Sequence, residues 1–463
     1  MGNSLSYWPL IVLLLGVGLV VTLITVVRAH PFIALILSAV LIGILSGPLP
    51  GEENSNHFVQ AVELAMVEFG NVAGQIAWVI ALASVLGIAL TKSGAAEKIV
   101  EKFIHVFGER YSGLALLLAG FVLSIPVFFD TVFFLLVPIA HSMGRRSPHR
   151  YMLFILAVGC GAIITHSLVP PTPGPLIMAE TLELNLGFVI VAGLAASLIP
   201  IALGYTFAMK INRSFDVKPP AAETDNTPGP PPALPSFAVS VLPIVVPLIL
   251  IVMASAADIL YEHLEQKPAV HTFISFIGNK NVSMLFGTII ALWILASQRK
   301  LNVRDLEHEV VYPLQVAGPI ILITAAGGAF GGMIRHSGIG DTIQQLAASG
   351  FAINFILLAW LISATMKFAQ GSGTVAMITT SGIMAALIGP AGLPYHTMYI
   401  LLAIGFGSIT LSWMNDSAFW VVGKLSGFTE KQTLRSWTLT LALMSVAGLI
   451  EVLLLAWWLP MVG

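Results

Sequence analysis

Four stretches of polar residues interrupt an otherwise apolar sequence, and they hold the residue types that could do chemistry. They lie at 124–131, 165–175, 367–374 and 412–417. Between them they contain one lysine, two aspartates, one histidine and several hydroxyl and amide side chains. Hydroxyl and amide groups donate and accept hydrogen bonds of the kind a polyol needs, and a lysine supplies a counter-charge for an anion. The pattern predicts a binding site for a small polar anion.

Four of these side chains can carry charge at membrane depth, where an ionisable group is costly and by default functional. Lys367 is expected to face the carboxylate of a substrate; the alternatives are a lysine that reaches the membrane interface or pairs with an acid. Asp130 and Asp416 are candidates to carry a proton or to pair with Lys367, and each could instead cap the next helix. His166 could move a proton, donate to a carboxylate, or be a hydrogen-bonded core residue.

The predicted site also includes neutral side chains from the same four stretches. The predicted substrate-binding residues are Asp130, Thr131, His166, Ser167, Thr172, Lys367, Gln370, Gly371, Ser372, Thr374, Asn415, Asp416 and Ser417. The sequence has neither an HExxH motif nor a phosphate-binding glycine loop, and its single cysteine, Cys160, lies in an apolar run. We therefore predict no metal, no cofactor beyond a coupling proton, and no enzymatic activity.

The polar stretches require helices that can break inside a membrane. Three prolines within 170–173 cannot continue a helix, because proline lacks the backbone N–H and clashes with the preceding turn. Non-helical backbone at membrane depth is tolerated only where protein or a water-filled cavity satisfies its polar groups. A helix that restarts after such a break points its free N–H groups and the positive end of its dipole at the cavity, which favours a carboxylate.

Composition indicates that lipid solvates the whole chain. Of the 463 residues, 57% are hydrophobic and only 10% are charged, and the mean hydropathy is +0.92, whereas soluble domains carry about 25% charged residues. The net charge of −2 provides no basic field for nucleic acid. No basic segment precedes the apolar run that begins at Trp8, which predicts a transmembrane helix rather than a cleaved signal peptide.

Apolar stretches of membrane-spanning length occur throughout the chain. They lie at roughly 8–27, 30–47, 72–91, 111–141, 151–178, 186–209, 237–257, 282–297, 315–333, 352–388, 398–423 and 438–460. Proline is dense in 210–236, which predicts an extended aqueous linker. The linker separates an N-terminal transmembrane repeat at 1–209 from a C-terminal one at 237–463.

Lysine and arginine in short loops indicate the cytoplasmic side of a membrane. Most of the 21 basic residues gather in alternate loops, which predicts a multi-pass protein of the bacterial cytoplasmic (inner) membrane with its N-terminus outside. The stretches at 111–141 and 352–388 are too long for one crossing. We expect each to form a re-entrant hairpin, the first entering from the cytoplasm and the second from outside, beside about ten spans.

The two halves of the sequence resemble each other. Residues 86–94 parallel 330–338, and residues 157–163 parallel 403–409, at nearly the same offset. Since the charge pattern places the two hairpins on opposite sides, the sequence predicts two inverted-topology repeats in an all-α integral membrane protein. Each repeat has a re-entrant hairpin and a broken transmembrane helix, an arrangement typical of secondary transporters.

At these same breaks the sequence resembles the gluconate permease (GntP) family of the ion-transporter superfamily. The matching segments are 125–130 and 166–171 in the first half, and 327–331, 369–376 and 415–420 in the second. The likeness runs over essentially the whole chain. The resemblance implies proton symport of gluconate and related hydroxy-acids, a scaffold beside a moving transport domain, and a homodimer.

Three site residues differ from the usual pattern of that family. Members usually carry glutamate, histidine and arginine where this chain has Asp130, Thr172 and Lys367. The differences bear on the substrate and on the coupling ion. We expect proton-coupled uptake of gluconate or a related sugar acid by alternating access, with Asp130, Asp416 or His166 carrying the proton. A sodium-coupled carrier, or a carrier of D-serine or a dicarboxylate, is the alternative; a channel or an intramembrane enzyme is more remote.

Overall fold

The computed structural model is all-helical, as predicted from the sequence. It describes residues 7–50, 56–215, 217–220, 234–261, 264, 267–338, 342, 354–388, 393–414 and 416–461, and all regular structure in them is helical. Within this described part, seven spans are long and apolar enough to cross a membrane, or eight if a bent pair of helices counts as one. Five further apolar helices of 10–17 residues lie within the predicted stretches 8–27, 30–47, 352–388 and 398–423.

Most helices begin and end close to the limits of the predicted spans. In the first half they are α1 (Trp8–Thr25), α2 (Pro31–Leu45), α3 (His57–Lys92), α7 (Tyr151–Leu168), α8 (Pro173–Thr181), α9 (Leu186–Ala196) and α10 (Leu198–Asn212). In the second half they are α11 (Phe237–Leu260), α13 (Lys280–Arg299), α14 (Val303–His336), α18 (Met398–Ile409), α19 (Ser417–Leu425), α20 (Glu430–Thr433) and α21 (Leu439–Trp458). Most of the predicted linker lies outside the described residues.

The stretch 111–141 folds back on itself. Helices α5 (Ser112–Leu123) and α6 (Phe129–Arg146) are separated by a short turn. Just beyond α6, the guanidinium of Arg150 donates to the carbonyl oxygens of Glu109 (3.1 Å) and Arg110 (2.9 Å), which precede α5. The chain therefore enters and leaves this element at the same level, which is the geometry of a re-entrant hairpin.

The second long stretch, 352–388, also contains two helices. They are α16 (Phe355–Gln370) and α17 (Gly373–Ile388). Between them Gly371 has φ 75°, in the left-handed region that glycine adopts without strain, and its N–H donates to the carbonyl of Lys367 at 2.8 Å. This C-cap ends α16 and turns the chain into α17 within two residues.

The helices fall into two groups by packing. The frame group, α1–α3 with α11–α14, is built around the contact of α3 with α14. The site group, α5–α10 with α16–α21, contains both hairpins and both broken helices. The most extensive contact between the groups is α14 against α17, where a Cβ on Gly331 would lie 2.5 Å from the Cα of Gly382.

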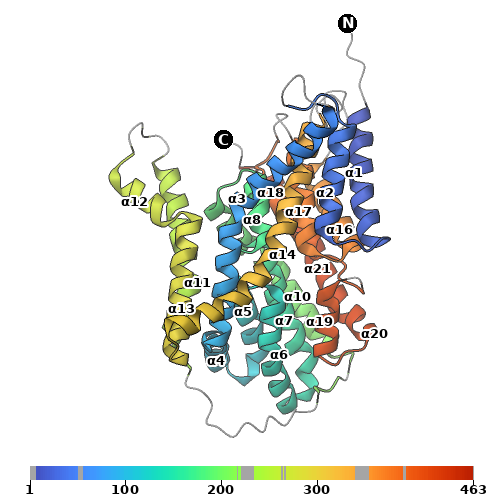
Figure 1. The fold of residues 1–463 in the computed structure, drawn as a ribbon. Coiled ribbons are helices and arrows are strands. Elements are labelled where there is room, and N and C mark those ends of the chain that lie inside the picture. The colour runs from blue at the N-terminus through green and yellow to red at the C-terminus, as the bar shows by residue number, and fades with distance from the viewer. Residues whose placement is uncertain are drawn as a thin grey trace.

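Two helices outside the predicted spans mark opposite ends of the molecule (Figure 1). Helix α4 (Ala95–Phe107) joins α3 to α5, and the chain bends by 115° between α4 and α5. Helix α12 (Ala269–Ile277) joins α11 to α13. We call the two ends the α4 face and the α12 face. Helix α14 runs from the α4 face to the α12 face, and α3 runs the opposite way (Figure 1).

Candidate binding site

The four predicted breaks meet around one cavity of about 350 Å³. Most of the predicted site residues line it: Asp130, Thr131, His166, Ser167, Lys367, Gly371, Ser372, Thr374, Asp416 and Ser417. The volume is within the range of small-molecule sites. We call it the central cavity.

Two predicted site residues, Thr172 and Gln370, are placed differently, and the structure does not describe a third. Thr172 is 1% exposed, and its hydroxyl donates to the carbonyl oxygens of His166 (2.9 Å) and Val169 (2.8 Å). It therefore holds the unwound segment between α7 and α8 and lies behind the cavity wall. Gln370 does not line the cavity; its amide nitrogen lies 3.8 Å from the sulfur of Met366. Asn415 lies outside the described residues.

Four helices begin at the central cavity. Their first residues, Phe129 of α6, Pro173 of α8, Gly373 of α17 and Ser417 of α19, all line it. The first N–H groups of a helix have no intrahelical partner, and the aligned peptide dipoles add partial positive charge there. The breaks therefore direct four positive helix ends at one space, which is a favourable environment for a carboxylate.

A buried ion pair lies on the wall of the cavity. The Nζ of Lys367 lies 2.7 Å from Oδ2 of Asp416 and donates to the carbonyl of Gly371 at 3.2 Å. The two charged residues are only 5% and 3% exposed. An ammonium has three N–H donors, so one donor of Lys367 has no partner among the described residues and is available to a ligand in the cavity.

Asp416 accepts three hydrogen bonds. Its Oδ1 accepts from the backbone N–H of Ala418 at 3.1 Å, which caps α19. Its Oδ2 accepts from the hydroxyl of Ser412 as well as from Lys367. Charge-assisted bonds of this kind favour the ionised carboxylate. The structure thus realises two of the alternatives weighed for Asp416, the helix cap and the partner of Lys367.

The other two candidate proton carriers have fewer partners. Asp130 is exposed to the cavity, and the described residues offer its carboxylate neither a hydrogen bond nor an ion pair. The Nδ1 of His166 is buried with no hydrogen-bond partner in the same part of the chain. The His166 ring meets the ring of Phe128 edge-on, with centroids 6.3 Å apart.

The frame group contributes only an apolar wall to the cavity. Its lining residues are Val316, Ile320, Ile323 and Thr324 of α14. The hydroxyl of Thr324 donates to the carbonyl of Ile320 at 2.7 Å, within its own helix. The charged and polar groups that could hold a ligand therefore come from the site group.

The central cavity adjoins a second cavity on the α4 side. That cavity, of about 540 Å³, lies between α3, α6 and α14, and it shares Phe128, Thr131 and Val316 with the central cavity. The hairpin tip formed by Phe128 and Thr131 is thus common to both spaces. The binding site is consequently oriented toward the α4 face.

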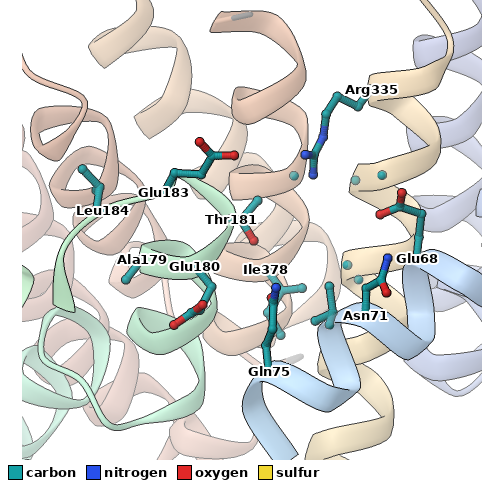
Figure 2. A pocket seen from close by; sticks show the side chains of 16 residues that line it. Glu68, Asn71, Gln75, Ala179, Glu180, Thr181, Glu183, Leu184, Arg335 and Ile378 are labelled. Atoms are coloured by element: carbon teal, nitrogen blue, oxygen red, sulfur yellow. The ribbon is translucent and has the colours of Figure 1, made fainter. Parts of the chain in front are cut away.

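A third cavity, of about 560 Å³, lies nearer the α12 face and shares none of its described lining residues with the central cavity. Figure 2 shows Glu68 and Arg335, from α3 and α14, opposite Glu183, which follows α8. Glu68 Oε1 lies 3.1 Å from His336 Nε2, and Glu180 forms an ion pair with Lys280 of α13. This space lies between the frame and site groups.

Comparison with known sequences identifies the family. The sequence model of the GntP family permeases matches residues 8–458. The chain belongs to the GntP permease family. A gluconate permease of Pseudomonas aeruginosa (strain PAO1) is 32% identical over 459 residues, which cover 97% of this chain and 98% of the relative. The Gnt-II system L-idonate transporter of Escherichia coli K12 is 28% identical over 445 residues, 96% of this chain and 98% of that protein.

A solved structure has a similar fold. The YdaH transporter of Alcanivorax borkumensis, described as having an unusual topology, matches with a TM-score of 0.63 at 14% identity, over 93% of this chain and 99% of that one. The likeness concerns the fold alone. The overall fold of this GntP permease therefore has a solved counterpart.

Sequence reasoning missed part of the site of this GntP permease. Ser408 at the end of α18 and Thr324 on α14 both line the cavity. Ser412 lies inside one of the four polar stretches and contacts Asp416. Position in that stretch was the only available signal for Ser412. The other two lie in apolar spans, where a single hydroxyl residue more often bonds to its own helix.

Proposed function

We propose that this GntP permease takes up gluconate or a closely related sugar acid together with a proton, by alternating access. The observation that carries the proposal is the convergence of Lys367 and four helix N-termini on one cavity lined with hydroxyl groups. The two relatives named above are a gluconate permease and an L-idonate transporter. Both names specify sugar acids, molecules with a carboxylate at one end and hydroxyls along the chain.

The cavity can hold each part of such a molecule. The carboxylate would accept the third N–H of Lys367 and the free backbone N–H groups at the starts of α17 and α19. The hydroxyls would bond to the side chains of Ser372, Thr374, Ser417 and Thr131, which line the cavity. The apolar residues of α14 would cover the carbon chain without competing for hydrogen bonds.

The charges in the cavity support a coupled proton. Lys367 is neutralised by Asp416, so an ionised Asp130 leaves the empty site with one net negative charge. A substrate carboxylate would add a second negative charge in a space of reduced dielectric, where like charges repel strongly. A proton on Asp130 removes one of them. We infer that Asp130 carries the coupling proton and that Asp416 stays ionised.

The cavities support alternating access. The binding site adjoins the α4-side cavity, and the separate cavity near the α12 face lies on the other side of the contact between α14 and α17. Movement of the site group along α3 and α14 would carry the charged groups from one side to the other. The helices that bind the substrate would then also be the helices that move.

Charge indicates which face is cytoplasmic. Basic residues gather at the α4 face, including Arg110, Arg145 and Arg150 around the first hairpin and Lys424 and Lys431 around α19 and α20. Cytoplasmic loops carry an excess of lysine and arginine. We infer that the α4 face is cytoplasmic in a bacterial inner membrane, which puts the N-terminus outside. The central cavity is then oriented toward the cytoplasm.

A competition experiment tests the substrate. The protein is reconstituted in proteoliposomes, and uptake of radiolabelled gluconate under an inward proton gradient is measured with excess glycerate, fructuronate, D-serine or succinate. We expect saturable uptake that sugar acids inhibit and that D-serine and succinate leave unchanged. Lys367 offers a donor for one carboxylate and not for the second one of succinate, and D-serine has too few hydroxyls to bond to Ser372, Thr374, Ser417 and Thr131. Inhibition by succinate or D-serine without gluconate uptake would overturn the assignment.

A further inference from the structure

The ion pair in the central cavity ends a chain of hydrogen bonds that begins outside it. The indole Nε1 of Trp437 donates to Oγ of Ser412 at 2.9 Å. The hydroxyl of Ser412 donates to Oδ2 of Asp416, the same oxygen that lies 2.7 Å from Nζ of Lys367. Trp437 and Ser412 are both 0% exposed and line no part of the cavity. Their hydrogen bonds reach the cavity through Asp416 and Lys367.

Trp437 fixes the direction of this chain. An indole N–H can only donate a hydrogen bond, whereas a serine hydroxyl has one proton and can also accept. Since Oγ of Ser412 accepts from the indole, its own proton is free to be donated to Asp416. A proton donated to Oδ2 requires that oxygen to act as an acceptor. This series of hydrogen bonds therefore favours the carboxylate form of Asp416, with Lys367 as its charged partner.

The position of Trp437 is determined by contacts with both halves of the site. It lies in the π-helical turn Leu434–Thr438, and π turns inside helices occur frequently at functional sites. Its ring packs on the ring of Phe129, with centroids 5.7 Å apart, at the tip of the first hairpin. A Cβ on Gly159 of α7 would lie 2.4 Å from the same ring. One side chain thus contacts the first hairpin, the first broken helix and the second break.

We propose that Trp437, acting through Ser412, is a positioning residue that keeps Asp416 ionised and directs the ammonium of Lys367 at the carboxylate of the substrate. The role in substrate binding rests on the proposed function, whereas the role in holding the ion pair does not. A consequence is that Asp416, which accepts from Lys367, Ser412 and the N–H of Ala418, acts as the partner of Lys367 and does not carry the coupling proton.

The protein contains a second tryptophan–serine pair that serves as a matched control. Trp360 of α16 donates from Nε1 to Oγ of Ser445 at 3.0 Å, and Ser445 donates to the carbonyl of Phe406 at 2.6 Å. This is the same indole–serine relay in the same group of helices, and it leads to a backbone carbonyl instead of the ion pair. Trp437→Phe and Trp360→Phe each remove one N–H donor and keep a ring in place. Ser412→Ala removes the relay without changing either tryptophan.

The first measurement is the kinetics of gluconate uptake in proteoliposomes. Trp437→Phe removes a neutral hydrogen bond and Ser412→Ala removes one to a charged group, which is the stronger kind. We therefore expect KM to rise roughly threefold to tenfold in Trp437→Phe and tenfold or more in Ser412→Ala. Vmax should change by less than about twofold, because binding weakens in the ground state and the transition state alike. Trp360→Phe should keep the KM of the unmodified protein. Equal KM values in Trp437→Phe and Trp360→Phe would overturn the proposal.

The second measurement needs no substrate. Acetic anhydride acetylates lysines in the detergent-solubilised protein, and mass spectrometry compares labelling of Lys367 with that of Lys424 in the same sample. We expect Lys367 to be labelled several-fold faster in Trp437→Phe and Ser412→Ala than in Trp360→Phe, because its partner is no longer held. Unchanged labelling would refute the positioning role. If the unmodified protein takes up no gluconate, the proposed function fails while this measurement still decides the positioning role.

Discussion

Lys367 and Asp416 form a buried ion pair, so a substitution of either residue affects both the stability of the protein and the binding of substrate. They are 5% and 3% exposed and 2.7 Å apart. Removing one partner of a buried pair leaves an uncompensated charge, whereas replacing both leaves none. Single and double variants therefore separate the structural contribution of the pair from the contribution of Lys367 to binding.

We expect Lys367→Met to lower the free energy of unfolding by about 3–5 kcal/mol, because Asp416 is left buried without its counter-charge. The double variant Lys367→Met with Asp416→Asn should regain most of that stability and still fail to bind gluconate. Thermal unfolding in detergent and equilibrium dialysis with labelled gluconate measure the two effects. A double variant that binds gluconate normally would show that Lys367 has only a structural role.

Asp130 is the carboxyl group whose substitution should uncouple the proton from the substrate. Asparagine resembles the protonated acid and cannot release a proton, so Asp130→Asn should keep exchange of internal for external gluconate and lose accumulation driven by a proton gradient. Glu101→Gln, an exposed carboxylate on α4 that pairs with Lys98, is the control and should accumulate gluconate normally. Proton-driven accumulation by Asp130→Asn would exclude Asp130 as the carrier.

The residues of the site were predictable from the sequence to the extent that polar groups stand out in apolar spans. Lys367, Asp130 and Asp416 were visible for that reason. Trp437 was not, because a tryptophan at the start of a span is ordinary in a membrane helix and its partner Ser412 lies 25 residues away. Thr172 was correctly located at a break, yet its hydroxyl bonds to the carbonyls of the break itself.

At the scale of helices, the breaks were predictable and the surface helices were not. Proline at 170 and 171 and glycine at 371 stop a helix by backbone chemistry alone. Helices α4 and α12 lie outside the apolar spans, so a search for spans does not detect them. Helix α3 begins at His57, well before the predicted span at 72–91, because its first turns carry polar residues and still pack against α14 and α2.

The crossing of α14 and α17 depends on glycine for its close approach. A Cβ at 331 would lie 2.5 Å from the Cα of Gly382, so Gly331→Ala should lower the free energy of unfolding by about 1–3 kcal/mol through overpacking. Gly318→Ala on the same helix is the control, since a Cβ there meets nothing within 4 Å. It should be neutral or stabilise by up to about 1 kcal/mol. Equal melting temperatures for the two variants would show that the crossing is not tightly packed.

At the scale of the whole molecule, ion pairs at opposite ends of α3 and α14 fit the predicted inverted repeat. Lys92 at the end of α3 pairs with Glu309 near the start of α14, and His336 at the end of α14 pairs with Glu68 in the first half of α3. The same arrangement thus occurs at both ends of one antiparallel helix pair. The repeat itself stays a prediction, and these contacts support it.

Movement between the two helix groups can be tested with a reversible cross-link. Glu180 of α8 and Lys280 of α13 form an ion pair across the boundary between the groups. Cysteines at these positions, in a Cys160→Ala background, would be bridged with a short reducible bis-thiosulfonate reagent. We expect bridging to abolish uptake and reduction to restore it, because the site group could no longer move.

The control bridges Asp258→Cys to His271→Cys, a pair of contacting residues within the frame group, and should transport normally when bridged. Full uptake by the bridged Glu180–Lys280 variant would contradict movement of α8 relative to α13. Loss of uptake in both bridged proteins would show that the reagent, and not the restraint, blocks transport.

Proton movement driven by gluconate tests the central claim most directly. Proteoliposomes loaded with a pH-sensitive dye, with no initial pH difference, are given an inward gluconate gradient while the membrane potential is clamped. The account predicts acidification of the interior that depends on gluconate, disappears in Asp130→Asn and does not require sodium. Gluconate entry without acidification, or acidification that persists in Asp130→Asn, would contradict it.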